Sequence, residues 1–370
     1  MKTYILKRLL LMVPTLVGIT LVTYFIVRLA PGDPIEAMIR NQSGNIDPKV
    51  MKADADRIRQ RLGLIEYHYL RDAVFGRQGT GEPAPGGVLG GLVAAADKVA
   101  SIGIGYGRWI GHLVAGDFGE SIIYRTSGGS RNPLHLMAER LPVTVTLNVI
   151  AEALIFVLAL PAGFAAARYQ GRWFDRGSSF VLLALYSIPT ILAGTVLIGY
   201  LGAGGRGWEA FPIAGLHSLG YEAFSWGRYF GDLFWHAALP VVCLVYGALA
   251  YLAKMGRASL LENLRADYVR TARAKGAPER RVVYHHALRN SLLPMITTMV
   301  LAIPGLIGGS IIVEGIFSIQ GTGLLLLGAA QAYDLALIMA ETLLYGVLTL
   351  VFLLIGDILY AWADPRVRYE

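Results

Sequence analysis

Long runs of apolar residues constrain this chain more than any other feature of its sequence. A helix of about twenty residues, rising about 1.5 Å per residue, crosses a hydrocarbon core of roughly 30 Å. Because lipid cannot satisfy backbone hydrogen bonds, and because each run is about twice the length of a barrel strand, the runs are predicted to be helices. Six of them occur, at residues 9–29, 143–167, 179–200, 234–253, 292–313 and 340–360. The predicted fold class is an all-α membrane protein with six transmembrane helices.

Composition excludes a soluble enzyme. Of the 370 residues, 55% are hydrophobic and 16% are charged, whereas about a quarter are charged in a typical soluble domain. The mean hydropathy of +0.51 points the same way. The apolar excess must therefore face lipid.

The first apolar run could also open a secretory signal, because Lys2, Lys7 and Arg8 precede it. A signal core is roughly 7 to 15 residues long and ends in a small-residue cleavage site. This run is longer, and it ends in the sequence RLAPGDP. It is therefore predicted to be retained as a span.

The distribution of Lys and Arg predicts the orientation of the chain. Three lie before the first span, three lie in the loop after the second, and nine lie between Lys254 and Arg289. The opposite short loops hold only Arg206 and Arg228. By the positive-inside rule both termini are cytoplasmic. The net charge of +7 is then mostly a topology signal, and no nucleic-acid partner is expected.

Three regions follow from this topology. Residues 1–30 form the first transmembrane helix with a cytoplasmic N-terminus, residues 31–141 form a large external region, and residues 142–370 form a five-helix core whose longest cytoplasmic loop is 254–291. In the external region, Asp47-Pro48 and Gly63 predict the ends of one helix. Residues 76–91 are rich in glycine and predict a flexible loop, and residues 92–115 form a weakly amphipathic stretch.

The sequence gives little support for catalysis. It has no Gly-Lys dipeptide and hence no P-loop, and it has no nucleophile elbow or HExxH motif. The single Cys243 excludes an internal disulfide, and His285 and His286 point to different faces of a helix. An intramembrane hydrolase would need a base and a nucleophile at one depth, and no serine can be assigned to His236. No catalytic residue, metal site or cofactor is expected in this chain.

Residues 266–294, ADYVRTARAKGAPERRVVYHHALRNSLLP, are the most informative segment. Gly276 interrupts a helical pattern, and Pro278 suits the start of the next helix, so two short helices joined by a sharp turn are expected. We call this segment the elbow. Its small residues would allow another protein to approach closely. The nine basic residues of the loop would equally suit contact with anionic lipid head groups.

The segment resembles the coupling loop of ATP-binding cassette importer permeases, whose pattern is Glu-Ala-Ala, three residues, Gly, nine residues, Ile, one residue, Leu-Pro. Here Arg270-Thr271-Ala272 takes the first place and Gly276 the glycine, while His286 and Arg289 depart from the isoleucine and the proline. The departures are similar to the dipeptide, oligopeptide and nickel branch, which reads YVRTARAKG, then HALRN and a later proline, here Pro294.

Further stretches resemble the same branch. They are RLLLMVPTLVGITLVTYFIVRLAPGDP near the start, GDFGES from Gly116, RLPVTVTL from Arg140, VEGIFSIQGTGLLLL from Val313 with Asp334 after it, and Asp364-Pro365-Arg366 at the end. The resemblance covers most of the chain except residues 66–106, which look like an insertion in the external region. That insertion would extend contact with a delivery partner or serve no function.

The resemblance implies a type I importer permease in the inner membrane of a prokaryote, importing peptides or peptide-like solutes. It implies a second permease chain that completes the translocation path, two ATPase subunits that bind ATP and Mg, and an external substrate-binding protein. No cofactor is implied in this chain. The elbow would couple to the ATPase subunits through Tyr268, Thr271, Ala272, Arg273, Gly276, Ala277, Glu279 and Arg280.

Two carboxylates are candidates for the translocation path, because a charged group at mid-bilayer costs roughly 2.5 to 3.5 kcal/mol and needs a reason to be there. Glu152 is the deeper one and could contact a peptide amino group. Glu314 could gate the path or cap a turn. Gly305, Gly308 and Gly309 are predicted to form a small-residue face that packs against the second permease.

Two other functions stay open. A nickel-chelate importer would share the same architecture. A self-sufficient channel or secondary carrier would also explain six helices and a buried glutamate, although the sequence shows neither the paired repeats nor the interrupted helices that are common in carriers.

Overall fold

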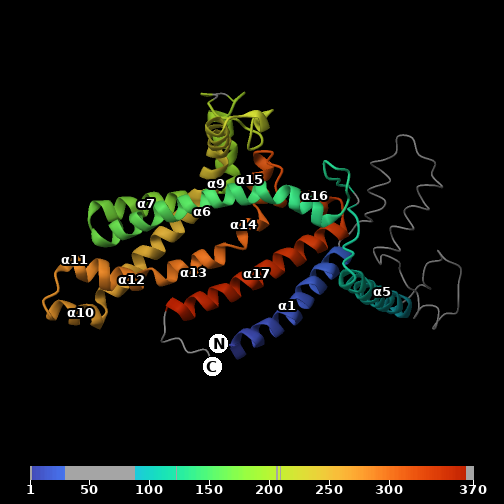
Figure 1. Ribbon diagram of the computed structural model, residues 1–370, viewed down its shortest axis with the longest axis horizontal. Helices are drawn as coiled ribbons and strands as arrows, with labels where there is room; N and C mark the ends of the chain where they lie inside the picture. Colours follow the sequence, from blue (N-terminus) through green and yellow to red (C-terminus); the bar gives the residue numbers. More distant parts are fainter. Residues whose placement is uncertain (1, 30–87, 122, 206, 209, 364–370) are drawn as a thin grey trace. The chain divides into compact units, whose positions relative to one another are not determined.

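The computed structural model describes residues 2–29, 88–121, 123–205, 207–208 and 210–363, and Figure 1 shows their helices. Helices account for most of these residues, and no strand occurs among them apart from one isolated bridge between Gly202 and Phe211. The helix predicted near residues 47–63, most of the glycine-rich loop 76–91 and the first part of the insertion 66–106 lie outside the described residues.

The helices fall into two groups by length. The long ones are α1 (Lys2–Leu29), α5 (Val88–Val114), α6 (Pro133–Arg168), α9 (Trp226–Arg265) and α17 (Leu335–Ala363). The shorter ones are α7 (Trp173–Ser187), α8 (Thr190–Leu201), η1 (Tyr221–Ala223), α10 (Asp267–Ala274), α11 (Glu279–Arg281), the π-helix η2 (Val282–Ala287), α12 (Leu288–Ser291), α13 (Leu293–Ala302), α14 (Gly305–Gly308), α15 (Ile311–Ile316) and α16 (Thr322–Gln331).

Five stretches of helix are long and apolar enough to cross a membrane: Tyr4–Leu29, Pro133–Arg168, Trp226–Arg265, Glu279–Ile316 and Leu335–Ile358. The pair α7 and α8 supplies a sixth if the two count as one span, although they are bent by 93°. All six predicted runs thus fall on helix. Several helices are longer than the apolar runs from which they were predicted, because a helix can continue beyond its apolar part.

The expectation of uninterrupted spans is wrong at two places. Pro189 has no N–H, and the chain bends there between α7 and α8. The Ile188 carbonyl is satisfied by the Tyr246 hydroxyl of α9 at 2.7 Å. The second break lies between α13 and α15, where Figure 1 shows the chain changing direction around α14. Interrupted helices of the kind common in carriers are therefore present in this chain.

The chain divides into two compact units, each with its own core. The first unit comprises Arg140–Leu325 and the chain after Leu348. Its core lies between α6 and α9 and includes Leu147, Ile155 and Leu252, all nearly inaccessible. In this unit α9 is the central helix, since α7, α8, α12, α13 and α15 all contact it.

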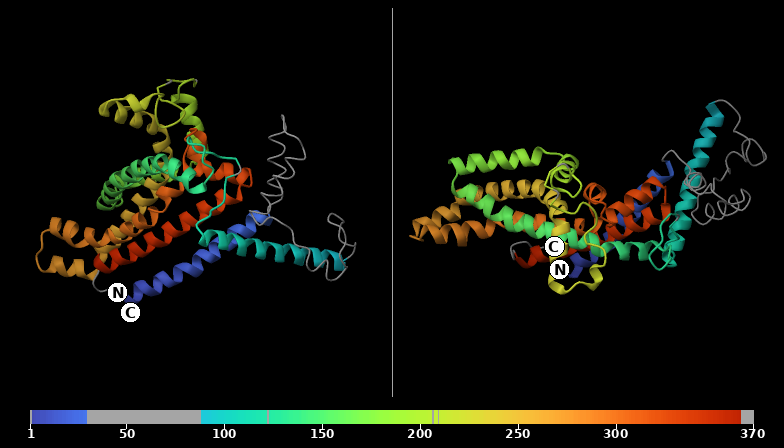
Figure 2. Two further views of the ribbon diagram at one scale, coloured as in Figure 1. Left: turned by 45° about the vertical axis from the view of Figure 1, so that its right-hand side comes forward. Right: turned by 90° about the horizontal axis from the view of Figure 1, so that it is seen from above.

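The second unit comprises Lys2–Glu139 and Leu326–Val347. Figure 2 shows α5 meeting the C-terminal half of α1. The Tyr106 hydroxyl joins the two helices, because it lies 3.0 Å from the Val17 carbonyl oxygen and 2.8 Å from Thr20 Oγ1. Tyr24 meets the Tyr106 ring edge-on at 5.6 Å and is fully buried. The amphipathic stretch predicted at residues 92–115 is thus a helix.

Candidate functional site

The predicted elbow consists of α10, a left-handed turn at Gly276 and a second helical arm formed by α11, η2 and α12. Gly276 has φ +79°, which a residue without a Cβ adopts freely. Its N–H donates to the Arg273 carbonyl at 2.9 Å, and the Ala277 N–H donates to the Ala272 carbonyl at 3.2 Å. This pair of bonds is the Schellman pattern that satisfies the last carbonyls of a helix. The turn expected at Gly276 is therefore present.

A bidentate ion pair closes the elbow. The guanidinium of Arg273 in α10 donates from Nη2 to Glu279 Oε1 at 2.8 Å and from Nε to Oε2 at 3.1 Å. The Glu279 carboxylate thereby raises the pKa of Arg273 above its ordinary value. Because both side chains are largely exposed, the pair contributes at most about 1 kcal/mol to stability. Its effect is to fix the angle between the two arms.

The elbow rests on an apolar seat. Val269 of α10 and Val282 and Ala287 of the second arm are each 0% exposed. They form one cluster with Ala167 at the end of α6 and Leu260 in α9. Burying a valine side chain stabilises a fold by about 1.5 to 3 kcal/mol, so this seat outweighs the surface ion pair. The elbow is therefore fixed to two long helices.

Two polar contacts strengthen this attachment. The Ser259 hydroxyl of α9 donates to the Ser291 carbonyl of α12 at 3.1 Å, while the Ser291 hydroxyl donates to the Ala287 carbonyl at 2.7 Å. Arg257 of α9 donates to both carboxylate oxygens of Asp175 in α7, at 2.6 and 2.8 Å, and Asp175 is only 4% exposed. Helices α7, α9 and α12 are thus joined near the elbow.

Close helix contact adds to the rigidity. A Cβ on Gly163 of α6 would overlap the Ala253 carbonyl of α9, and one on Gly256 would lie 2.9 Å from Met295 Cε. Glycines let these backbones approach closely. Sequence reasoning missed Gly163, Asp175, Arg257, Ser259 and Ser291, because their partners are distant in the chain.

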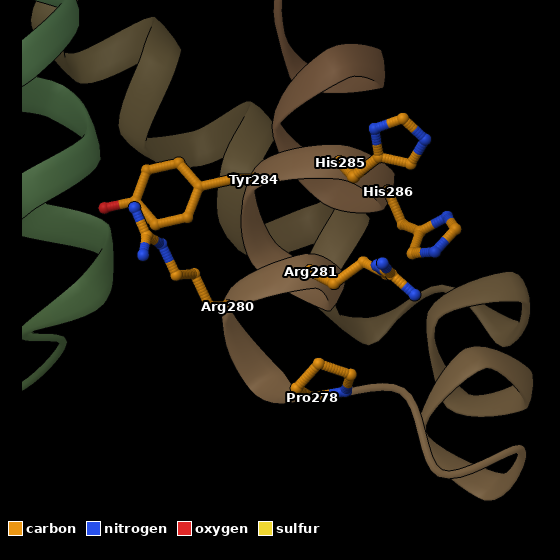
Figure 3. A pocket seen from close by; sticks show the side chains of 6 residues that line it. All are labelled: Pro278, Arg280, Arg281, Tyr284, His285 and His286. Carbon is orange, nitrogen blue, oxygen red and sulfur yellow. The ribbon is translucent and has the colours of Figure 1, made fainter.

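The eight predicted coupling residues all lie on the elbow. Ala272 and Ala277 turn partly toward the apolar seat, whereas the other six are exposed. Figure 3 shows that Arg280 and Tyr284 extend from one side of the second arm, toward the green ribbon, while Arg281, His285 and His286 extend from the other. The outer surface of the elbow is therefore basic, with small residues at its turn.

Glu314 lies at the centre of a buried polar network. Its side chain is 0% exposed. Oε1 accepts hydrogen bonds from the Thr144 hydroxyl at 3.1 Å and from the Ser310 N–H at 3.3 Å, and Oε2 accepts one from the Leu324 N–H at 2.7 Å. Of the two roles that the sequence left open for Glu314, this geometry favours holding a turn. Contact with cargo would require the network to open.

Glycines surround this carboxylate. A Cβ at Gly321 would lie 2.5 Å from Glu314 Cδ, and one at Gly323 would lie 2.9 Å from the Ile311 nitrogen. Gly309 has φ +68° and ends α14. It therefore makes a turn and, contrary to the expectation, is not part of a helix face. A Cβ at Gly305 would meet nothing within 4 Å. The predicted packing face therefore includes at most Gly305 and Gly308.

Polar side chains follow one another along α6 at intervals of four residues. Arg140 donates to Gln320 Oε1 at 3.0 Å, Thr144 donates to Glu314, and Asn148 donates to the Leu306 carbonyl at 3.2 Å. Glu152 is the next in this row and is half-buried. Among the described residues, no side chain or backbone group forms a hydrogen bond or ion pair with its carboxylate. Within the described chain, Glu152 therefore lacks the hydrogen-bond partners that Glu314 has.

The histidine considered for hydrolysis has no serine partner in the described chain. His236 Nδ1 lies 2.9 Å from the Asp232 carbonyl oxygen, and the nearby Ser218 hydroxyl donates to the Asp232 carboxylate at 2.6 Å. The serine therefore contacts the acid and not the base. This geometry does not assemble a nucleophile with a general base.

Part of the sequence matches a known family, and the full length is similar to transport proteins. Residues 159–369 match the family model described as "Binding-protein-dependent transport system inner membrane component". The oligopeptide transport system permease protein AppB of Bacillus subtilis is 34% identical over 369 residues, covering 100% of both chains. The di/tripeptide transport system permease protein DppB of Pseudomonas aeruginosa is 33% identical over 383 residues, again covering 100% of both. The peptidoglycan transport system permease protein YejB of Agrobacterium fabrum is 30% identical over 375 residues, covering 100% of this chain and 99% of its own.

Proposed function

Because the chain belongs to the family of binding-protein-dependent transport system inner membrane components, we propose that it is the permease subunit of an ATP-driven importer for peptides or peptide-like solutes. It is a transport subunit of the inner membrane and not an enzyme. In this proposal the chain forms half of a translocation path, and a second, homologous permease forms the other half. Both termini and the elbow lie on the cytoplasmic side.

The energy for transport comes from other subunits. Two ATPase subunits bind ATP and Mg, and one of them docks on the elbow of this chain. An external binding protein delivers the cargo, and the family's description as binding-protein-dependent supports that partner. The full-length similarity to peptide permeases supports the peptide class of cargo. A nickel-chelate importer remains the alternative cargo class.

The observation that carries the proposal is the attachment of the elbow. Its outer side offers small and basic residues, and its inner side is fixed by Val269 and Val282 to α6 and α9. A force applied to the turn at Gly276 is therefore passed to the spans and is not lost in bending of the loop. Motion of an ATPase dimer would tilt these helices between inward-open and outward-open arrangements.

Gly276→Trp in the reconstituted transporter tests the docking role. We expect the variant to insert and assemble normally, and to hydrolyse ATP without driving uptake, because the indole occupies the surface that the ATPase approaches. The control is Gly220→Trp. Gly220 also has positive φ, +78°, and also has nothing within 4 Å of a built Cβ, but it lies in the loop between α8 and α9, predicted to be external. The backbone cost of roughly 1 to 2 kcal/mol is then the same in both variants.

Uptake by Gly276→Trp at the level of Gly220→Trp would contradict docking at the elbow. A second measurement distinguishes this importer from a self-sufficient carrier, the alternative that the interrupted helices keep open. Liposomes containing this chain without ATPase subunits should show no cargo flux. Flux under those conditions would support a self-sufficient carrier or channel.

A further inference from the structure

A groove of about 930 Å³ separates the elbow from the ends of α6 and α7. Its rim carries four arginines that we name the rim arginines: Arg168, Arg172, Arg265 and Arg280. Arg273 also lines the groove, but Glu279 neutralises it. Among the described residues that line the groove, Glu279 is the one carboxylate. The rim arginines therefore concentrate positive charge that the groove itself does not balance.

The rim arginines have few partners within the protein. Arg172 lies over the Tyr169 ring, with its Cζ 5.9 Å from the ring centroid. In the described part of the chain, the side chains of Arg168, Arg265 and Arg280 form no hydrogen bond or ion pair. All four are exposed at the mouth of the groove. Arginine presents a planar fork of donors that matches the oxygens of a phosphate.

Part of the wall of the groove is apolar. Leu261 and Leu264 of α9 and Val283 of the second arm are half-buried and line it, together with the nearly buried Leu260. Arg280 and Tyr284 extend from one side of the second arm, as Figure 3 shows, and both line the groove. A basic rim above an aliphatic wall is complementary to an amphiphile with an anionic head, and a fully hydrated anion would leave the wall unused.

The groove lies at the ends of candidate spans. Its rim includes the ends of α6 and α9, which belong to candidate spans, and the turn that joins α6 to α7. Next to it, Trp173 is 83% exposed and Tyr169 is 42% exposed, which is typical of aromatic residues at a membrane interface. The count of Lys and Arg predicts that this is the inner leaflet.

We propose that the groove binds an anionic phospholipid of the inner leaflet, with its phosphate between the rim arginines and an acyl chain along the leucines of α9. The bound lipid relieves repulsion among the arginines and links Arg280 of the elbow to Arg168 and Arg172 at the ends of α6 and α7. Anionic lipid would thereby stiffen the elbow. This site does not depend on the proposed transport function.

Lipid retention by the purified protein tests the proposal. The full-length chain, with the subunits that co-purify, is titrated in detergent with phosphatidylglycerol or with neutral phosphatidylcholine, and bound lipid is counted by native mass spectrometry. We expect a preference for phosphatidylglycerol that the double variant Arg172→Gln, Arg265→Gln weakens about 30-fold, from about a factor of five per basic residue. The control is Arg281→Gln, Arg289→Gln, which removes the same charge from residues that do not line the groove.

Three results would overturn the proposal: equal binding of the neutral lipid, an equal loss in the control, or an unchanged affinity in the double variant. Two competitors identify other occupants. Soluble glycerol phosphate should compete poorly, and displacement by it at equal concentration would mean a free-anion site. Displacement by an acidic peptide but not by lipid would mean a protein-docking surface. If the double variant does not fold, the two single variants replace it, each with an expected loss of about fivefold.

Discussion

Replacing Glu314 by glutamine should separate a role in structure from a role in transport. The amide keeps one acceptor oxygen and introduces an NH2 group where the second oxygen was. If the NH2 replaces Oε2, it faces the Leu324 N–H; if it replaces Oε1, it faces the Thr144 hydroxyl and the Ser310 N–H. Every orientation therefore leaves at least one buried donor without an acceptor.

The magnitude follows from the cheaper orientation. One orphaned buried donor costs about 1 to 3 kcal/mol, so we expect a loss of about 2 kcal/mol. At about 2 to 4 °C per kcal/mol for a domain of this size, the unfolding temperature should fall by roughly 4 to 8 °C. Glu152→Gln is the matched control, because it makes the same substitution at a carboxylate with no partner among the described residues.

The assay is thermal unfolding of the full-length protein in detergent, followed by uptake in liposomes containing the complete transporter. Glu314→Gln should lower stability, and Glu152→Gln should leave stability unchanged but reduce uptake if the α6 carboxylate contacts a cargo amino group as proposed. Wild-type stability in Glu314→Gln would refute the reasoning about the buried network. Wild-type uptake kinetics in Glu152→Gln would assign that residue to helix packing.

Two further predictions concern the attachment of the elbow. Asp175→Asn should destabilise the protein by about 3 kcal/mol in thermal unfolding, because it leaves Arg257 without its charged partner, whereas the same change at the exposed Asp267 should cost under about 0.5 kcal/mol; equal effects would contradict the importance of burial. Reversing the Arg273–Glu279 pair by Arg273→Glu with Glu279→Arg should restore coupling of ATP hydrolysis to uptake that either single change reduces. A double variant no better than the singles would show that the individual charges matter, and not the angle they fix.

The sequence predicts the elbow well because its determinants are local. The left-handed turn needs Gly276, and the following arm needs only Pro278 a few residues later. The spans are predictable for a similar reason, since each is a property of about twenty consecutive residues. What the sequence does not predict is the π-helix η2 within the second arm, for which we have no physical account.

The interactions that decide the roles of particular residues are not local. Glu314 and Thr144 are 170 residues apart in the chain, and Arg257 and Asp175 are 82 apart. From the sequence, Glu152 and Glu314 are both candidates for the translocation path. The fold distinguishes them, because Glu314 is enclosed by three donors and Glu152 meets none in the described chain. Pro189 is a mixed case, because its missing N–H interrupts the helix locally, whereas the Tyr246 hydroxyl that donates to the Ile188 carbonyl lies in α9.

The distribution of stiffness within the first unit suits a lever. At the elbow, buried valines, the Ser259–Ser291 hydrogen bond and the Asp175–Arg257 pair resist relative motion. Farther along the same elements, the backbone is interrupted at Pro189, and bending costs least where helical hydrogen bonds are already missing. A displacement applied at the elbow therefore moves its attached helix ends together, and the break concentrates the deformation. Had the flexible break lain beside the elbow instead, the same force would have bent the loop and left the spans unmoved.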